Sequence, residues 1–236
     1  MTQFVGKWFE KRFDHSGRFC KPNLVPKDKF RAANIVRYME FCLVLEQLPN
    51  RTKFHWLDEK HLVNKDVEAT KVRVDPLTGY IPCIMVNGDF RDAYNLVAII
   101  SACPTKEKPV AYSIGRENGT AASFLVFVQF LLQNNWFERG DVLIMDNASI
   151  HTGGEADIVE DLLWHAKQVL VVYLPTRSPE LNPIELIFHI LARRIRSFRY
   201  RELVGSCDKA VLALSCRVLD EMSYDLVSRC CRHCGY

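Results

Sequence analysis

The sequence lacks any long hydrophobic run, since no stretch of about 18 uninterrupted apolar residues occurs in it. Its first residues, MTQFVGKWFEKRFDHSGR, carry too many charges for a secretory signal. Repeats, low-complexity tracts and a flexible interdomain linker are absent as well. The lack of a long apolar run and of a secretory signal argues against membrane-spanning and secreted proteins and predicts a soluble, intracellular protein. At 236 residues, 48% of them hydrophobic, the chain is large enough for one sizeable domain core.

The cysteine pattern argues against disulfide bonds and gives only weak support for a metal site. Nine cysteines are scattered along the chain, an odd number without an export signal, so reduced thiols are expected. The C-terminal run RCCRHCGY packs Cys and His closely, but a zinc site usually needs a second ligand pair separated by a spacer, and no such pair is in sequence reach. We interpret the run as the end of a packed helix or an exposed tail, with a metal site as the lesser alternative.

Net charge is only +3, which by itself does not indicate nucleic-acid binding. The distribution of charge is more informative, because a group of arginines with two interleaved aromatic residues lies in one probable helix and its exit. These are the candidate DNA-binding residues: Arg193, Arg194, Arg196, Arg199 and Arg201. A solvated basic face near a helix C-terminus is an equally good interpretation.

Two acids stand where metal ligands are expected. Asp146 directly follows the apolar run VLIM, which is typical of a buried strand, and Asn147 follows it as a turn former. Glu185 lies in Asn-Pro-Ile-Glu, where Asn182 is a helix cap and Pro183 occupies the first helical position. An acid that ends a strand and an acid that opens a helix form the layout of a metal-dependent nuclease.

A third acid is needed because two divalent ions require several hard oxygen ligands from rigid elements. The best candidate is Asp58 in FHWLDEKHL, which shares one strand face with Phe54 and Trp56 by the two-residue period. Glu59 would point to the opposite face. Glu59, Asp66 and Asp75 remain competitors for this assignment.

Three local motifs resemble those of mariner-like DDE transposases, the DDE superfamily endonucleases. LDEKHL resembles the motif of the first acid, MDNASIH that of the second, and LPTRSPELNPIE that of the third, in the right order. The last is the most specific. The second and third acids are 39 positions apart, somewhat more than is commonest in the group, and the extra residues fit between Leu174 and Leu181.

The resemblance implies a function and a set of site residues. Asp58, Asp146 and Glu185 would be the catalytic, metal-binding triad, holding two Mg²⁺ ions or Mn²⁺ in their place, with His151, Asn147 and Asn182 as accessory residues. The reaction would be DNA strand cleavage and strand transfer by a homodimer, with no membrane or small-molecule partner. Such a protein would be nuclear in a eukaryote and otherwise cytoplasmic.

Each of these residues has a simpler interpretation. Glu185 would close a capping box with Asn182, Asp146 would start a turn, Asp58 would end a strand in solvent, and His151 would be an ordinary residue of a first helical turn. Two alternative functions remain open: a non-catalytic DNA-binding or assembly protein derived from a transposase, and a ribonuclease H-type nuclease acting on hybrid duplexes. The LPTRSPELNPIE motif argues against the second.

The order of expected elements predicts an α/β fold, a ribonuclease H-like mixed five-stranded sheet flanked by helices. Six candidate strands, one more than such a sheet holds, are predicted at 53–58, 81–87, 94–101, 110–114, 142–145 and 169–173. Helices are predicted at 121–134 and 154–167, with a further helix bearing Glu185. We expect three regions: an N-terminal linker and helix at 1–50, the DDE catalytic domain at 51–202 and a C-terminal helical segment at 203–236.

The N-terminal region departs from the family pattern. Full-length relatives carry a helix-turn-helix region, and this sequence begins too close to the catalytic segment to hold one, so a truncated or domesticated copy is expected. Residues 30–48 predict one amphipathic helix that packs on the domain through Ile35, Met39, Phe41, Cys42 and Leu45.

Overall fold

The computed structural model describes residues 27–49, 53–62, 94–104, 106–116, 119–146, 154–202 and 208–236. Five strands form one sheet in the order β3-β2-β1-β4-β5. Their bounds are Phe54–Leu62 (β1), Tyr94–Ser101 (β2), Val110–Gly115 (β3), Val142–Met145 (β4) and Leu170–Tyr173 (β5). β1, β2 and β3 pair antiparallel, whereas β4 is parallel to both β1 and β5. This mixed sheet confirms the predicted ribonuclease H-like fold class.

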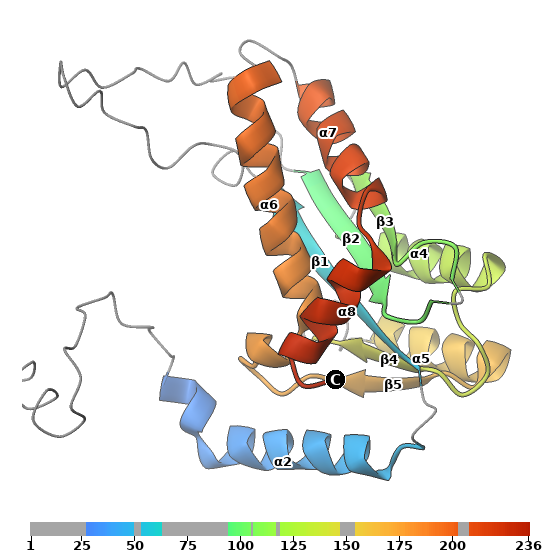
Figure 1. Ribbon diagram of the computed structural model, residues 1–236. Coiled ribbons are helices and arrows are strands. Elements are labelled where there is room, and N and C mark those ends of the chain that lie inside the picture. Colours follow the sequence, from blue (N-terminus) through green and yellow to red (C-terminus); the bar gives the residue numbers. More distant parts are fainter. Residues whose placement is uncertain are drawn as a thin grey trace, which may run out of the picture.

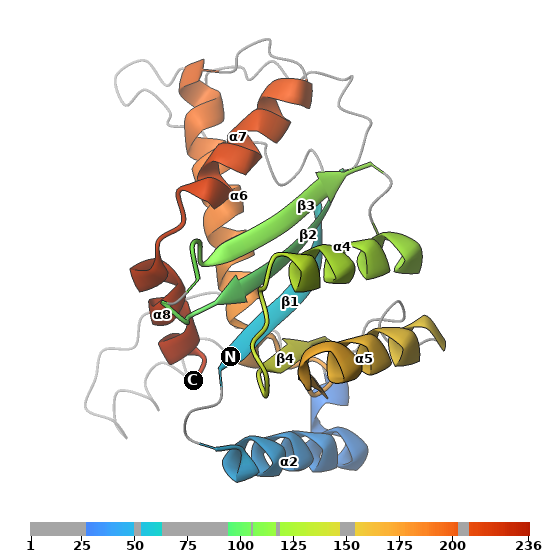
Figure 2. The same ribbon diagram turned by 90° about the vertical axis from the view of Figure 1, so that its right-hand side faces the viewer.

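Helices cover both faces of the sheet. One face packs against α6 (Pro183–Glu202), α7 (Asp208–Asp220) and α8 (Tyr224–His233), as Figure 1 shows. The other face packs against α4 (Ala121–Gln133) and α5 (Gly154–Lys167), which lie in front of the sheet in Figure 2. Two apolar cores result: the first core lies between the sheet and α6, α7 and α8, and the second core between the sheet and α4 and α5. The sequence of β1 explains this division, because Trp56 lies in the first core and its neighbour Leu57 in the second. Among the helices of the described ranges, none combines the length and the hydrophobicity of a membrane span.

The strand predicted at 53–58 is longer in the structure, where it is β1. We predicted that this strand ends at Asp58, but β1 continues to Leu62. Its pairing with β4 stops after Leu57, whereas its antiparallel pairing with β2 runs on until Leu62 meets Tyr94. Asp58 therefore lies in mid-strand, at the place where one neighbouring strand ends and the other continues. The strand expected at 81–87 lies outside the described residues.

The N-terminal helix is confirmed as α2 (Ala32–Gln47), preceded by the short η1 (Lys27–Phe30), but its expected packing face is wrong in part. Phe41 is buried, and Cys42 and Leu45 pack beside it against the first core. Ile35 and Met39 instead face solvent. The pattern misled because apolar residues occupy two sides of this helix.

The C-terminal cysteines lie at the end of a packed helix, which was one of the two favoured interpretations. Cys230, Cys231 and Cys234 are buried, and burial raises the pKa of Cys231 to about 12. Such thiols are protonated near neutral pH and act as small apolar side chains. The C-terminal helices thus add to the same core as the central sheet.

Candidate functional site

Strand register brings the first two candidate acids to neighbouring positions. Leu57 of β1 pairs with Met145 of the parallel strand β4, and the next residue on each strand is Asp58 and Asp146 respectively. Because both strands run in the same direction, the two acids lie side by side just after the Leu57–Met145 pair, at the C-terminal end of β4. Asp58 is 6% exposed, and Asp146 is half-buried.

Glu185 reaches the same region on the first turn of α6. This helix packs on the face of β1 that carries Trp56, through the buried side chains of Ile184, Ile187, Phe188 and Leu191. The Glu185 side chain is exposed, while Ile184 beside it is fully buried. The helix therefore anchors its apolar side in the core and leaves the acid on the solvent side of the first turn.

The buried carboxylate of Asp58 is held by two hydrogen bonds. Oδ1 accepts from the backbone amide of Glu59 at 2.7 Å, and Oδ2 accepts from Nδ2 of Asn182 at 2.8 Å. Asn182 is buried and directly precedes α6. The residue predicted as a helix cap thus directs its side chain to the first acid and ties the start of α6 to β1.

The charges of the other two candidate acids act on Asp58. Burial and the negative charges of Asp146 and Glu185 raise the pKa of Asp58 to about 7, against the lowering effect of its hydrogen bonds. Repulsion of this kind is typical of carboxylates gathered in one place without a compensating cation. Asp58 is therefore the acid of β1 that lies within electrostatic reach of both other candidates.

Glu59 differs from Asp58 in its surroundings. Burial and the charge of Asp146 raise its pKa to about 7, but Glu185 is not among the causes. Its Oε1 is buried without a hydrogen-bond partner in the described part of the chain. By strand alternation it lies on the α4–α5 face of β1, opposite to Asp58. The sequence pattern identified Glu59 only as a competitor and gave no signal for its proximity to Asp146.

The donor set fits a hard divalent cation in its chemistry, because all three acids offer oxygen. The arrangement as it stands is looser than a closed site: across the described ranges, no group of three or more His, Cys, Asp or Glu side chains is placed to hold a metal ion. What the structure shows is an acidic region centred on Asp58. The accessory candidates Asn147 and His151 and the competitors Asp66 and Asp75 lie outside the described residues.

The predicted arginine group lies on α6, which also carries Glu185. Arg193 is exposed, and Arg194 and Arg196 are half-exposed, with Nε of Arg196 donating to the backbone oxygen of Ala192 at 3.1 Å. Arg199 and Arg201 belong to the last turns of this helix, and their side chains are not described. One helix therefore carries an acid at its start and a series of cations towards its end.

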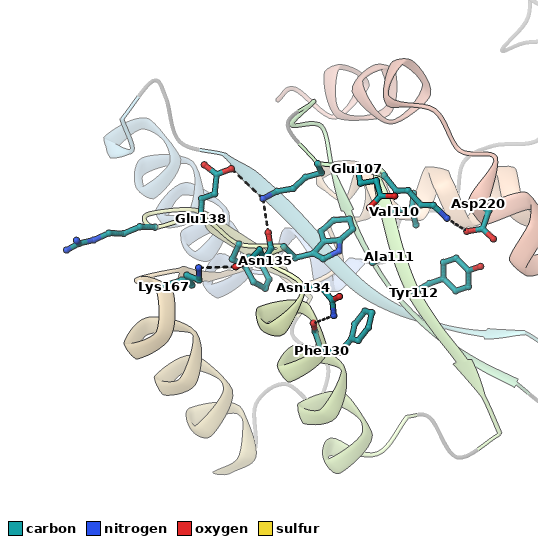
Figure 3. Close-up of a pocket in the computed structure, with 15 residues that line it drawn as sticks. Glu107, Val110, Ala111, Tyr112, Phe130, Asn134, Asn135, Glu138, Lys167 and Asp220 are labelled. Atoms are coloured by element: carbon teal, nitrogen blue, oxygen red, sulfur yellow. Dashed lines mark hydrogen bonds and ion pairs between the residues drawn. The ribbon is translucent and has the colours of Figure 1, made fainter.

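A separate cavity of about 740 Å³ lies at the other end of β4 (Figure 3). Its lining includes residues that precede this strand, such as Trp136 and Glu138, and four of its charged side chains are paired within the protein. Lys106 lies 3.6 Å from Glu138, and Lys108 lies 2.9 Å from Asp220. None of the three candidate acids lines it, so it is distinct from the acidic region.

Comparison with known proteins finds one matching family model. Residues 92–204 match the family model of the DDE superfamily endonucleases, a range that includes Asp146 and Glu185 but begins after Asp58. A search of curated protein sequences finds no match.

Three solved structures share the fold. The Mos1 strand transfer complex matches with a TM-score of 0.65 and 17% identity over 98% of this chain and 65% of that one. The Mos1 mariner paired end complex with Mn matches with a TM-score of 0.64 and 14% identity over 98% of this chain and 67% of that one. The catalytic domain of Mos1 mariner transposase matches with a TM-score of 0.56 and 13% identity over 90% and 91%. The family match over residues 92–204 and the shared fold confirm the predicted resemblance to the DDE superfamily endonucleases and to the fold of the Mos1 mariner transposase.

Proposed function

We propose that this protein cleaves DNA strands and joins them by metal-dependent phosphoryl transfer at Asp58, Asp146 and Glu185. The observation that carries the proposal is the electrostatic coupling of Asp58 to both other acids, from three elements that are far apart in sequence. We infer strand cleavage and strand transfer in one centre by similarity, because the Mos1 structures that share the fold include a strand transfer complex.

The three acids would hold two divalent cations, Mg²⁺ or Mn²⁺. Bound there, the ions would lower the pKa of the attacking water and would neutralise charge on the phosphate. Structures of the similar Mos1 protein contain Mn and Mg, which supports this choice. The buried hydrogen bond from Asn182 would fix the orientation of Asp58, and Asn147 and His151 would be accessory groups.

DNA is the proposed partner. A DNA backbone that follows α6 from the C-terminal end of the helix towards the acids would pass Arg196, Arg194 and the exposed Arg193 before it reaches Glu185. Two copies would act together on two DNA ends, as the paired end complexes of the similar protein suggest. We propose a nuclear location for a eukaryotic source and a cytoplasmic location otherwise.

The test is a plasmid cleavage assay with Mg²⁺ or Mn²⁺ on the wild-type protein and the Asp146→Asn variant. Asp161→Asn, at an exposed acid of α5, is the matched acid-to-amide control. We expect Asp146→Asn to abolish cleavage while the fold and DNA affinity are retained, and Asp161→Asn to cleave normally. Undiminished metal-dependent nicking by Asp146→Asn would remove this residue from the chemistry.

A non-catalytic DNA-binding or assembly protein is the second candidate. Among the residues that the structure describes, no closed group of three ligands is preformed, and this observation favours it. Titration calorimetry with Mn²⁺ separates the two candidates. Binding that disappears in Asp146→Asn supports the nuclease, whereas DNA binding without metal binding or cleavage supports the assembly protein.

A further inference from the structure

Helix α2 exposes a row of large apolar side chains on the side that faces away from the domain. Val36, Met39 and Leu43 are 51%, 60% and 53% exposed, and Ile35 lies beside them. The opposite side of the same helix holds it to the first core through Phe41, with Cys42, Leu45 and Leu48 packed beside it. The exposed row is therefore not needed to attach α2 to the protein.

The spacing of the row is that of a helix–helix seam. Its members are Ala32, Val36, Met39 and Leu43, which follow one another at intervals of four, three and four residues. This alternation places every member on one narrow stripe, as in the a and d positions of a coiled coil. A surface helix usually carries polar residues on its outer side, so an outer stripe of this kind fits a partner helix.

The charges of this segment favour an antiparallel partner of the same sequence. The part from Lys27 to Met39 contains four Lys or Arg residues and one Asp, whereas the part from Glu40 to Leu48 contains two Glu residues and no cation. The first turn of α2 holds no acid and the last turn no base. The helix dipole favours the reverse distribution, so these charges do not stabilise α2 alone. An antiparallel second copy would bring each basic end beside an acidic end.

We propose that the outer row of α2 is a contact between two copies of this protein, with the two α2 helices antiparallel about a two-fold axis. In this register Val36 of one copy meets Met39 of its partner, and Ala32 meets Leu43. Such an interface is isologous, since each pair of contacts occurs twice.

The proposed contact would also link the two acidic regions. Nζ of Lys29 forms an ion pair with Glu180, and Arg37 donates to Thr176 Oγ1 at 3.4 Å. Both partners lie between β5 and α6, in the segment that leads to Glu185. This contact would determine how the two protein copies of the proposed function meet. It concerns self-association alone, which is measured without DNA or metal. Failure of the nuclease proposal would leave it standing.

The first test is sedimentation velocity of the full chain across the micromolar range, with the single variants Val36→Glu and Met39→Lys. We expect a concentration-dependent dimer for the wild-type protein and a dissociation constant raised at least about tenfold in each variant. Val126→Glu is the matched control, because Val126 is equally apolar and 64% exposed on α4. This control should associate like the wild-type protein, and circular dichroism should show that all three variants are folded.

Mixing the two single variants tests the antiparallel register. The negative charge introduced by Val36→Glu in one copy would then face the positive charge introduced by Met39→Lys in the other. The second layer keeps its native contact of Met39 with Val36, so dimers should return. A parallel pair would leave each new charge against an apolar residue and would not recover. A wild-type protein that stays monomeric would overturn the inference, as would a dimer that only Val126→Glu disrupts, or a mixture that fails to associate.

Discussion

The side-chain amide of Asn182 donates a 2.8 Å hydrogen bond to Oδ2 of Asp58, a residue 124 positions earlier in the chain. Both residues are buried, and the bond joins the centre of β1 to the start of the helix that carries Glu185. Because the other carboxylate oxygen accepts from a backbone amide, the orientation of Asp58 is set on both sides. Together with the apolar packing of α6 on β1, this contact connects the first acid to the helix that carries the third.

We expect Asn182→Ala to lower metal affinity and cleavage about 10- to 100-fold, as loss of a hydrogen bond to a metal ligand typically does. Asp58 would keep its backbone contact but would be free to rotate. Mn²⁺ calorimetry and plasmid cleavage measure the two effects. Asn134→Ala, at the exposed C-cap of α4, is the control and should change neither. Wild-type metal affinity in Asn182→Ala would show that this bond has no positioning role.

The repulsion at Asp58 should be visible as a dependence of stability on pH. Its pKa is raised from 3.8 to about 7 in the folded protein, so the group is protonated when folded and ionised when unfolded between these values. Without a divalent cation, the free energy of unfolding should therefore fall as pH rises from about 4 to about 7, by up to about 4 kcal/mol. Urea unfolding in EDTA at pH 4.5 and pH 8 measures this change.

Asp58→Asn removes the ionisable group and so should stabilise the metal-free protein at pH 8 while leaving it little changed at pH 4.5. The same variant should lose cleavage, because the amide is a poorer ligand for Mg²⁺. A gain in stability together with a loss of activity is expected where carboxylates are gathered for function. Equal stability of both proteins at pH 8 would contradict the electrostatic account of this region.

Much of the fold was predictable because its elements are short-range patterns. The β2 strand and the α5 helix have the predicted bounds, since both are set by local apolar periodicity and flanking turns. The end of β1 was missed for a long-range reason: its pairing with β2 continues through the polar residues after Asp58. No local pattern shows which neighbouring strand ends first.

The candidate site was predictable in its composition but not in its geometry. Sequence motifs identified Asp58, Asp146 and Glu185, and their catalytic role stays a prediction. The hydrogen bond between Asn182 and Asp58 depends on how α6 packs against β1, which no spacing in the sequence reveals. The exposed row of α2 was missed for a similar reason, because a helix with two apolar sides does not show which side the core takes.

A second buried contact holds the opposite end of the sheet. His55 Nε2 lies 2.8 Å from Asp141 Oδ2, which also accepts the backbone amide of Glu138 at 2.8 Å. Burial would raise the pKa of Asp141, but these hydrogen bonds and the nearby positive charge lower it below its usual 3.8. A depressed pKa stabilises the fold above the unfolded value, and this contribution is lost as pH falls through the folded value.

We therefore expect Asp141→Asn to lose about 3 kcal/mol of unfolding free energy at pH 7. The loss should shrink as pH falls below 4 towards the lowered folded pKa of Asp141, through which the wild-type carboxylate itself becomes protonated. Guanidinium unfolding at pH 7 and pH 3 measures both quantities, with Asp161→Asn as the exposed control. A deficit of the same size at both values would mean that shape, not charge, makes Asp141 important.

The arginines of α6 predict the salt dependence of DNA binding. Each cation that contacts a phosphate releases about one counterion, so the slope of log affinity against log salt falls by about one unit for each contact removed. Arg193→Ala combined with Arg194→Ala should weaken binding to all DNA sequences alike and lower the slope by about two. Arg217→Ala is the matched control, because its Nε is paired with Glu221 at 3.0 Å on another helix. Fluorescence anisotropy between 50 and 300 mM salt would reject the proposed DNA path if the double variant kept the wild-type slope, since cations that touch no phosphate release no ions.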